Sequence, residues 1–542
     1  MSGYRDRLFN NGQGERMLNC LSRIAAVQDS AWDDLSALEK EIAMEFEAQR
    51  TGKVWRTRFY KFATNTTSSG TKMDDNAGMV AEPSTDTTEG RDDYLEYAVF
   101  QWRHCNYTRE SDGFAKVTAL KGYPGFAMTG AVDVGSLNMT FYWTVKEGAT
   151  YYDVIMSDTP HPELGLVPWI DAIRADGTVM PYFIVSAYAS VTASDSKPRS
   201  QHGCPIYTHS HDGAIDAYQT KGTGYWGAGV SRNTLQHVML AIKYATKNSQ
   251  TVFRGHVDTG SQQPKCAKAE TSVKRVLLSS QGKFYAGCCV SVGSGSNTDR
   301  GQSGMHDIVN RALVKSIETV TVSGTNYVAL NLDVDTAFTT ATTYTVSMMP
   351  TYSGETDLVL PGRDGSYLSN TDGAHPYRIK GVEYAIGMYF LATDTILSFN
   401  ADFTADVLCW PHGSKPAKNT STGYTKVGTT PRSNANNDDY FIGDCKYDTE
   451  HGVWFPATVG TGDSVGVGDK VFAGGNTASG LKEYLQGGFL TNGSIAGSGN
   501  LNRRNALSNA RWNIASADML QKICWPQYNI RLRASCKIAL SF

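Results

Sequence analysis

Residues 487–512 read GGFLTNGSIAGSGNLNRRNALSNARW, and this stretch says the most about the fold. The positions between its polar residues are mostly glycine or apolar, as in Gly487-Gly488, Gly493 and Ala506-Leu507. Short Asn and Ser side chains both donate and accept hydrogen bonds, so they suit a surface that adapts to a ligand. The pattern predicts polar side chains held outward by a packed scaffold, with a solvated Gly/Asn loop as the alternative. Asparagine recurs at Asn492, Asn500, Asn502, Asn505, Asn509 and Asn513.

Basic residues are concentrated in the last part of the chain. The net charge of −3 and the pI of about 6.4 give no general argument for nucleic acid or membrane as a partner. From residue 487 to the end, the one acidic residue is Asp518, and the basic residues are Arg503, Arg504, Arg511, Lys522, Arg531, Arg533 and Lys537. This excess predicts an acidic partner, such as an anionic glycan or an acidic protein. The alternative is a face turned to a neighbouring subunit.

Length and composition predict several domains rich in strands and loops. A chain of 542 residues is too long for one hydrophobic core. Only 19% of its residues are charged, whereas glycine (53) and tyrosine (28) are abundant, which is typical of β-rich extracellular or virion proteins. The opening MSGYRDRLFNNGQGER lacks the apolar core of a secretion signal, and no run of 18 apolar residues occurs. The ten cysteines form no C-x-x-C pair, so we expect reduced, buried thiols in a particle assembled in the host cytoplasm.

The first segment, residues 1–50, has a helical pattern. Its heptad positions fall on Met17, Leu21, Ile24, Gln28, Ala31, Leu35, Leu38 and Ile42. This seam predicts an oligomerising coiled coil, trimeric if the molecule is fibre-like. Gln28 and Ala31 weaken its middle, and Asp29-Ser30 could cap a second helix. The alternative is therefore an amphipathic helical hairpin packed on its own domain.

The next segment, residues 51–157, predicts a β-rich attachment domain. Stretches of β-branched and aromatic residues predict strands at 57–64, 94–108, 115–120 and 138–146.

The remainder of the chain, residues 158–542, has both helix and strand patterns. Apolar residues from Leu235 to Ala245 lie at helical spacing after Asn233, which we expect to cap that helix. Strand signals at 314–348 predict a β insertion near 310–350, and 529–540 predicts a closing strand.

Four blocks of residues 158–542 carry a family resemblance. They are the aliphatic stretch 182–188, the helix 233–251 that ends in SQT, the hairpin YRIKGVEYAIG at 377–387, and GGFLTNGSIAG at 487–497. In this order they resemble the C-type-lectin fold of the formylglycine-generating-enzyme subtype, and especially the variable proteins of phages and diversity-generating retroelements. The resemblance covers about 164–542. It implies an α+β chain with an N-terminal coiled-coil-like segment, a β-rich middle domain and a C-terminal lectin-like domain.

The resemblance also implies how such a protein binds its ligand. Variable side chains of a rigid lectin-like face would contact the ligand, and Trp512 would belong to the scaffold. Mutagenesis at template adenines makes Asn codons a common origin in retroelement targets, which would account for the Asn and Ser mixture. The implied ligand-binding positions are Asn500, Asn502, Arg503, Arg504, Asn505, Ser508, Asn509 and Asn513.

Catalytic and metal-binding motifs are weak throughout the sequence. Cys524 and Cys536 lie near the region of the cysteine pair of formylglycine-generating enzymes, but no catalytic pattern surrounds them. His209 and His211 form a weak metal-ligand pattern that a polar loop explains as well. Nucleophile-elbow, Walker and dinucleotide-binding motifs are absent. We therefore expect no enzyme activity, no cofactor and no metal.

The sequence as a whole predicts a phage virion protein. We expect the receptor-binding part of a tail or fibre, a homo-oligomer that contacts other tail proteins and a host-surface protein or glycan. One alternative is a structural virion protein, for head decoration or tail assembly, whose lectin-like domain binds other subunits. Another is a tail glycan depolymerase, which would need a cleft lined by two carboxylates.

Overall fold

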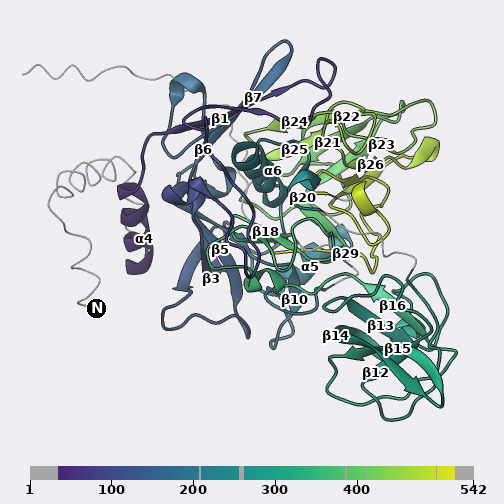
Figure 1. The fold of residues 1–542 in the computed structure, drawn as a ribbon. Coiled ribbons are helices and arrows are strands. Elements are labelled where there is room, and N and C mark those ends of the chain that lie inside the picture. The colour runs from purple at the N-terminus through teal and green to yellow at the C-terminus, as the bar shows by residue number, and fades with distance from the viewer. Residues whose placement is uncertain are drawn as a thin grey trace, which may run out of the picture.

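The computed structural model describes residues 35–206, 209–254, 262–384, 387–411, 413–495 and 497–518 (Figure 1). Strands dominate, at 35% of the described residues against 13% helix, so the α+β expectation is met with few helices. None of the described helices is long and apolar enough to cross a membrane. The heptad positions Met17 to Ala31 and the predicted closing strand 529–540 lie outside the described residues.

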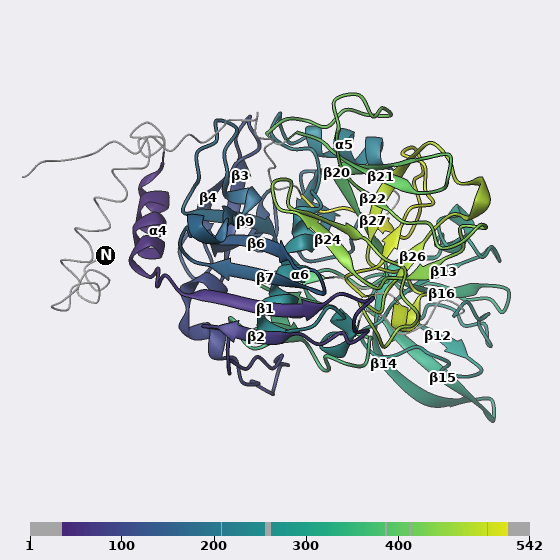
Figure 2. The ribbon, with the colours of Figure 1, turned by 90° about the horizontal axis from the view of Figure 1, so that it is seen from above.

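Two sheets form the N-terminal half of the main body (Figure 2). The five-stranded sheet has the order β2-β1-β7-β6-β8, with β1 Val54–Tyr60, β2 Thr71–Asp74, β6 Tyr142–Glu147, β7 Tyr151–Ser157 and β8 Val167–Pro168. The four-stranded sheet has the order β4-β3-β5-β9, with β3 Arg103–Arg109, β4 Ala115–Leu120, β5 Asp133–Met139 and β9 Tyr182–Ser186. Strands β8 and β9 come from the predicted third domain. No break in the sheets therefore marks the expected boundary after residue 157.

Two strand predictions in this half need correction. The predicted strand 94–108 begins as two 3-10 turns, because the Asp92 carboxylate caps the amide of Tyr94, and only β3 is extended. The predicted strand 138–146 is divided at Thr140 and Phe141, where the chain passes from one sheet to the other. The prediction for 115–120 is confirmed by β4.

Helix α4, Ala37–Ala48, packs on the body of its own chain. Ser36 and Glu39 form a capping box at its start. Leu35, Ile42 and Phe46 are buried in the core that the N-terminal sheets share, and the Tyr182 hydroxyl donates to Glu39 at 2.5 Å. For the described part of the predicted heptad, the apolar face thus serves intramolecular packing, as the alternative to a coiled coil expects.

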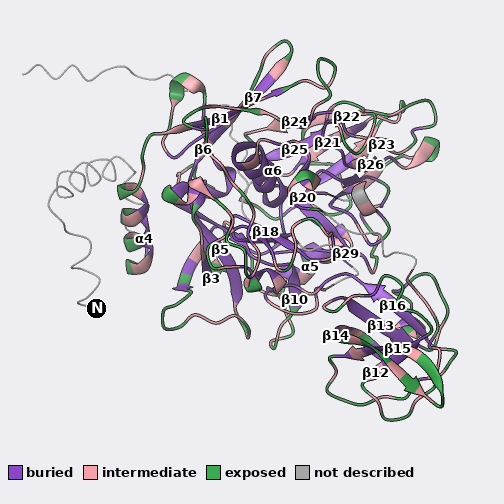
Figure 3. Ribbon diagram, viewed as in Figure 1, coloured by how far each residue is buried: buried purple, intermediate pink, exposed green. Residues whose placement is uncertain are grey.

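Helix α6, Ser231–Tyr244, runs through the centre of the molecule and is buried on all sides from Ser231 to Lys243 (Figure 3). It begins two residues before the expected cap. Asn233 lies within the helix, and its Oδ1 accepts from the Trp454 indole at 2.5 Å. The Asp394 carboxylate accepts from the Val230 amide at 3.0 Å instead. The prediction of a helix here was right, but the helix ends at Tyr244 and not at Thr251, and tertiary contacts replace the local cap.

The largest sheet follows the order β22-β21-β20-β27-β28-β26-β23, with β29 beside β20. Its long central strand, β20, packs near the start of α6. There the Thr393 amide donates to the carbonyl of Ala228 at 2.8 Å. The strands are β20 Tyr389–Phe399, β21 Ala405–Cys409, β22 Thr425–Thr430, β23 Tyr440–Phe441, β26 Lys470–Phe472, β27 Leu481–Gln486, β28 Leu501–Asn502 and β29 Ile514–Ala515.

Shorter elements complete the body. The predicted hairpin at 377–387 is confirmed by β18 and β19, which turn at Lys380 and Gly381, both with positive φ. The remaining pairs and helices are β10 Ser190–Thr192 with β11 Pro198–Ser200; β17 Gly365–Ser366, β18 Tyr377–Ile379 and β19 Val382–Tyr384; β24 Cys445–Asp448 with β25 Val453–Pro456; and α5 His211–Gln219. The 3-10 turns are η1 Asp93–Glu96, η2 Ala98–Phe100, η3 Pro162–Leu164, η4 Ile170–Ala172, η5 Ser249–Thr251, η6 Ser303–Met305, η7 Glu355–Leu358, η8 Gly475–Thr477 and η9 Gly493–Ile495.

A five-stranded sheet forms a separate lobe at the lower right of Figure 1, which we call the β12–β16 lobe. It has its own apolar core. Its order is β12-β15-β14-β13-β16, with β12 Arg275–Leu278, β13 Cys289–Gly293, β14 Val309–Val322, β15 Thr325–Leu332 and β16 Thr345–Met349. The predicted insertion near 310–350 covers its last three strands, and the lobe also includes two earlier ones.

Candidate functional site

The segment 487–513 leaves β27, makes the turn η9, pairs as β28 and reaches β29. Of the eight implied ligand-binding residues, three reach the surface. Arg504 and Ser508 are exposed and Asn509 is half-buried. The other five are buried, with exposures of 0% to 7%: Asn500, Asn502, Arg503, Asn505 and Asn513. The expectation that all eight face outward is therefore wrong for those five residues.

The buried residues of the segment hold the chain together. The Asn500 amide group donates to the carbonyl of Ile495 at 2.8 Å, and the Asn500 carbonyl accepts from Gly487 at 3.1 Å. The carbonyls of Asn505 and Asn513 accept from the amides of Glu483 and Tyr389. A buried polar group needs such partners: the Asn500 side chain supplies one, whereas the bonds of Asn505 and Asn513 come from the backbone.

Arg503 also bonds the segment to other parts of the chain. Its guanidinium donates to Thr430 Oγ1 at 2.7 Å and to Asn437 Oδ1 at 2.8 Å. The Phe399 and Tyr440 rings lie 5.2 and 5.6 Å from the guanidinium carbon. The side chain is fully buried, and burial lowers its pKa. Arg503 thus joins the segment to strand β22 and the 431–439 loop.

The Gly-Ser-Gly part of the segment closes over a buried carboxylate. Asp469 accepts from the amides of Gly497 at 2.8 Å and Gly499 at 2.9 Å, and from Gln250 at 3.0 Å. A Cβ on Gly497 would lie 2.6 Å from this carboxylate, so the close approach requires glycine. Burial raises the pKa of Asp469 to about 6. The glycines of the quoted sequence are thus explained by packing.

The exposed residues lie beside an open cavity of about 500 Å³, the Arg504 cavity, lined by Gly474, Gly475, Thr477, Ala478, Lys482 and Arg504. Arg504 donates to both oxygens of Asp439, at 2.6 and 2.5 Å, and lies over the Phe472 ring. Its side chain nevertheless stays 48% exposed. Lys482 on β27 pairs with Ala506, so the turn that carries Ser508 and Asn509 lies next to the same strand.

The charge of the Arg504 cavity favours an anionic or strongly polar ligand. It presents one guanidinium and one ammonium group, and the nearest ion-pair partner is Asp439. Beneath it, Glu483 is buried and accepts from the His211 amide at 2.9 Å. Burial raises the pKa of Glu483 to about 8, so this carboxyl adds little negative charge at neutral pH.

The sequence did not single out Lys482 or Asp439. Lys482 lies in an ordinary strand, and Asp439 in a polar loop 65 residues from its partner, so only the folded sheet brings them to Arg504. The Gly474-Gly475 pair was the available signal, since it marks a turn.

Trp512 packs against the β12–β16 lobe, as its expected scaffold role requires. The guanidinium carbon of Arg300 lies 4.9 Å from the centre of its ring.

Other candidate chemistry is dispersed. His211 is buried and bonded to Asp212 and to the Thr393 carbonyl, both at 2.9 Å. In the described part of the chain, no three His, Cys, Asp or Glu side chains form a group that could hold a metal ion. Cys524 and Cys536 lie outside that part. Neither the Arg504 cavity nor a second open cavity beside Lys72 and Tyr244 is lined by a pair of carboxylates.

Comparisons with known proteins add no information about the site. No protein-family model matches the chain, and no curated protein is similar to it.

Proposed function

We propose that this chain is a ligand-binding protein of a phage virion, which attaches the tail or fibre to a host-surface receptor. The Arg504 cavity carries the proposal. It includes Arg504 of the segment that resembles the variable region of retroelement-diversified proteins. The adaptable polar residues Ser508 and Asn509 follow Ala506, which pairs with Lys482 of the cavity. Its two basic side chains suit an acidic glycan or protein.

A C-type-lectin-like arrangement from about 164 to 542 is part of the same proposal. Its support is the order of four blocks: strand β9, helix α6, the β18–β19 hairpin, and the glycine-rich segment after β27. Oligomerisation through the N-terminal segment 1–50, outside helix α4, and a role without catalysis complete it. Several weak sites on one particle would then act together.

The proposal is tested by binding of the purified chain to envelopes of the bacteria that the particle infects. Replacing Arg504 or Lys482 with alanine should weaken binding by about tenfold or more, since each removes a charge from the cavity. Arg432→Ala is the matched control, because Arg432 is exposed and outside the cavity. Equal binding by all three variants would overturn the proposal.

The second candidate is a structural virion protein, favoured by the burial of five of the eight implied contact residues. In that case the exposed turn would face another subunit. A cysteine placed at the exposed Ser508 distinguishes the two, using a maleimide reagent on intact particles. Labelling supports receptor binding, whereas protection in the particle but not in the free chain supports the structural role.

A further inference from the structure

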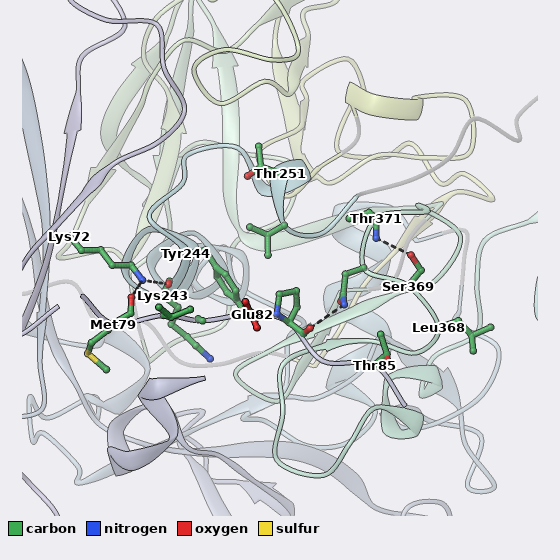
Figure 4. Close-up of a pocket in the computed structure, with 15 residues that line it drawn as sticks. Lys72, Met79, Glu82, Thr85, Lys243, Tyr244, Thr251, Leu368, Ser369 and Thr371 are labelled. Carbon is green, nitrogen blue, oxygen red and sulfur yellow. Dashed lines mark hydrogen bonds between the residues drawn. The ribbon is translucent and has the colours of Figure 1, made fainter. Parts of the chain in front are cut away.

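A second open cavity, the Lys72 cavity, shares no lining residue with the Arg504 cavity. Its volume is about 680 Å³, within the range of small-molecule sites. Three segments distant in sequence meet around it: residues 79–85, the end of α6 with η5, and the loop 368–371. Figure 4 shows Lys72 and Met79 on one side, Leu368 and Ser369 on the other, and Tyr244 and Glu82 between them.

The cationic groups of this cavity are already engaged. Lys72 Nζ donates to the carbonyls of Met79 at 2.8 Å and Lys243 at 2.6 Å. Lys243 Nζ donates to the carboxylates of Asp92 at 2.9 Å and Asp364 at 2.7 Å. Lys72 therefore caps the C-terminal end of α6, and the two aspartates neutralise Lys243. Neither ammonium group is left to select an anion.

The rest of the lining combines apolar surface with hydroxyl and amide groups and one carboxylate, that of the exposed Glu82, which accepts from the Arg91 amide at 3.0 Å. Leu368 is 54% exposed, one of the few large apolar side chains in the described residues to be so exposed, and it stands at the rim. Val252 and Tyr244 add to the apolar wall, while Thr371 and Ser369 supply hydroxyls. A ligand with one apolar face and a rim of hydroxyls fits this mixture better than an ion or a purely apolar molecule.

Two polar atoms of the lining residues lack a partner in the described structure. They are the hydroxyl of Tyr244 and Oδ1 of Asn370, both enclosed by protein atoms. The Asn370 amide nitrogen donates to the carbonyl of Ser84 at 3.2 Å, which leaves its oxygen unused. Asn370 lines the cavity, and because the χ2 torsion of asparagine is soft, this oxygen can reorient towards a bound ligand at the cost of the long bond to Ser84. A ligand hydroxyl would then satisfy it.

From this lining we infer that the Lys72 cavity is a binding site for a neutral saccharide unit. The apolar face of the sugar ring packs on Leu368 and Val252, and its hydroxyls bond to Asn370 and to the hydroxyls of the 368–371 loop. The site is independent of the Arg504 cavity. One chain would thus carry two sites of different charge preference.

The test is ligand-observed NMR on the full chain with neutral oligosaccharides of glucose, galactose and N-acetylhexosamine, and with uronate-containing ones for comparison. We expect at least one neutral sugar to bind. Thr371→Trp, which fills the cavity from an exposed position, and Leu368→Ser should each weaken that binding by about tenfold or more.

Matched controls separate this effect from damage to the surface. Thr422 is an exposed threonine whose amide bonds a side-chain oxygen two residues earlier, as that of Thr371 does. Leu358 has the same 54% exposure as Leu368 but does not line the cavity. Thr422→Trp and Leu358→Ser should leave binding unchanged. The inference is overturned if no neutral sugar binds, or if Thr371→Trp and Leu368→Ser bind as the unchanged chain does.

Discussion

Arg503 and Arg504 are neighbours in sequence but lie in opposite environments. The Arg503 side chain is fully buried between β22 and the 431–439 loop, whereas that of Arg504 is 48% exposed at a cavity. Because successive side chains of an extended segment point to opposite sides, Arg503 bonds within the scaffold, whereas Arg504 faces the proposed ligand. Beyond this pair the exposure does not alternate, since residues 497–503 are all buried and residues 508–511 are exposed or half-buried.

The two arginines should therefore differ in their effect on stability. Arg503→Ala removes two hydrogen bonds and leaves Asn437 Oδ1 buried without that donor, so we expect a loss of about 3 kcal/mol in the free energy of unfolding. Arg504→Ala should cost less than about 1 kcal/mol, because exposed ion pairs contribute little. Urea unfolding of both variants measures the difference. Equal losses would contradict the assigned roles.

Helix α4 provides a test of intramolecular against intermolecular packing. Ile42 is 2% exposed, so Ile42→Ala should lower the free energy of unfolding by about 2–4 kcal/mol. Because the contacts are within one chain, this loss should be the same at all protein concentrations. Met44→Ala, at 37% exposure, is the control with little effect. A loss that shrinks as protein concentration rises would instead place the Ile42 face in an oligomer interface.

Stability should also depend on pH through Glu483. An unfolded glutamate titrates near pH 4.3, whereas burial raises the pKa of Glu483 to about 8 in the folded chain. The folded state therefore holds the proton more tightly. The stability that this group contributes is complete below about pH 4 and is lost as the pH rises to about 8.

Glu483→Gln should remove that dependence, since its side-chain oxygen can still accept from the His211 amide. We expect the variant to be more stable than the unchanged chain by about 5 kcal/mol at pH 8.5, with a difference that falls towards pH 5. Chemical unfolding at several pH values measures this. Glu450→Gln, at an exposed position, is the control and should change neither curve. Parallel curves for the Glu483 variant and the unchanged chain would refute the effect.

The hairpin turn at Gly381 gives a prediction about backbone and space together. Its φ is +72°, and a Cβ would meet Ser136 Oγ at 2.3 Å and the Trp102 ring at 2.6 Å. Gly324 has a similar φ of +80° with open space around it. Gly324→Ala should cost about 1 kcal/mol for the backbone alone, and Gly381→Ala considerably more. Thermal unfolding compares them, and similar melting temperatures would show that the turn relaxes.

Local patterns predicted elements where the local signal and the tertiary environment agree. The helix after residue 230 and the hairpin at 377–387 are of this kind, since each carries its own spacing or turn residues. The cap at Asn233 was wrong because the helix begins two residues earlier, and Asp394, far along the chain, accepts from the Val230 amide that precedes it. The outward direction of Asn500 and Arg503 was wrong because composition does not reveal which polar residue will be needed inside. Lys482 and Asp439 join the site only through sheet pairing.

The burial pattern changes what sequence variation should look like if the segment is diversified. Substitutions among sibling isolates should gather at Arg504, Ser508 and Asn509, which reach the surface and where the side-chain bond at risk is the exposed Arg504–Asp439 pair. Asn500 and Arg503 should stay constant, because most replacements there leave buried groups unpaired. Sequencing the coding locus in many isolates counts the changes at each position. Variation spread evenly over buried and exposed positions would rule out this scaffold, and uniform constancy would favour the structural virion protein.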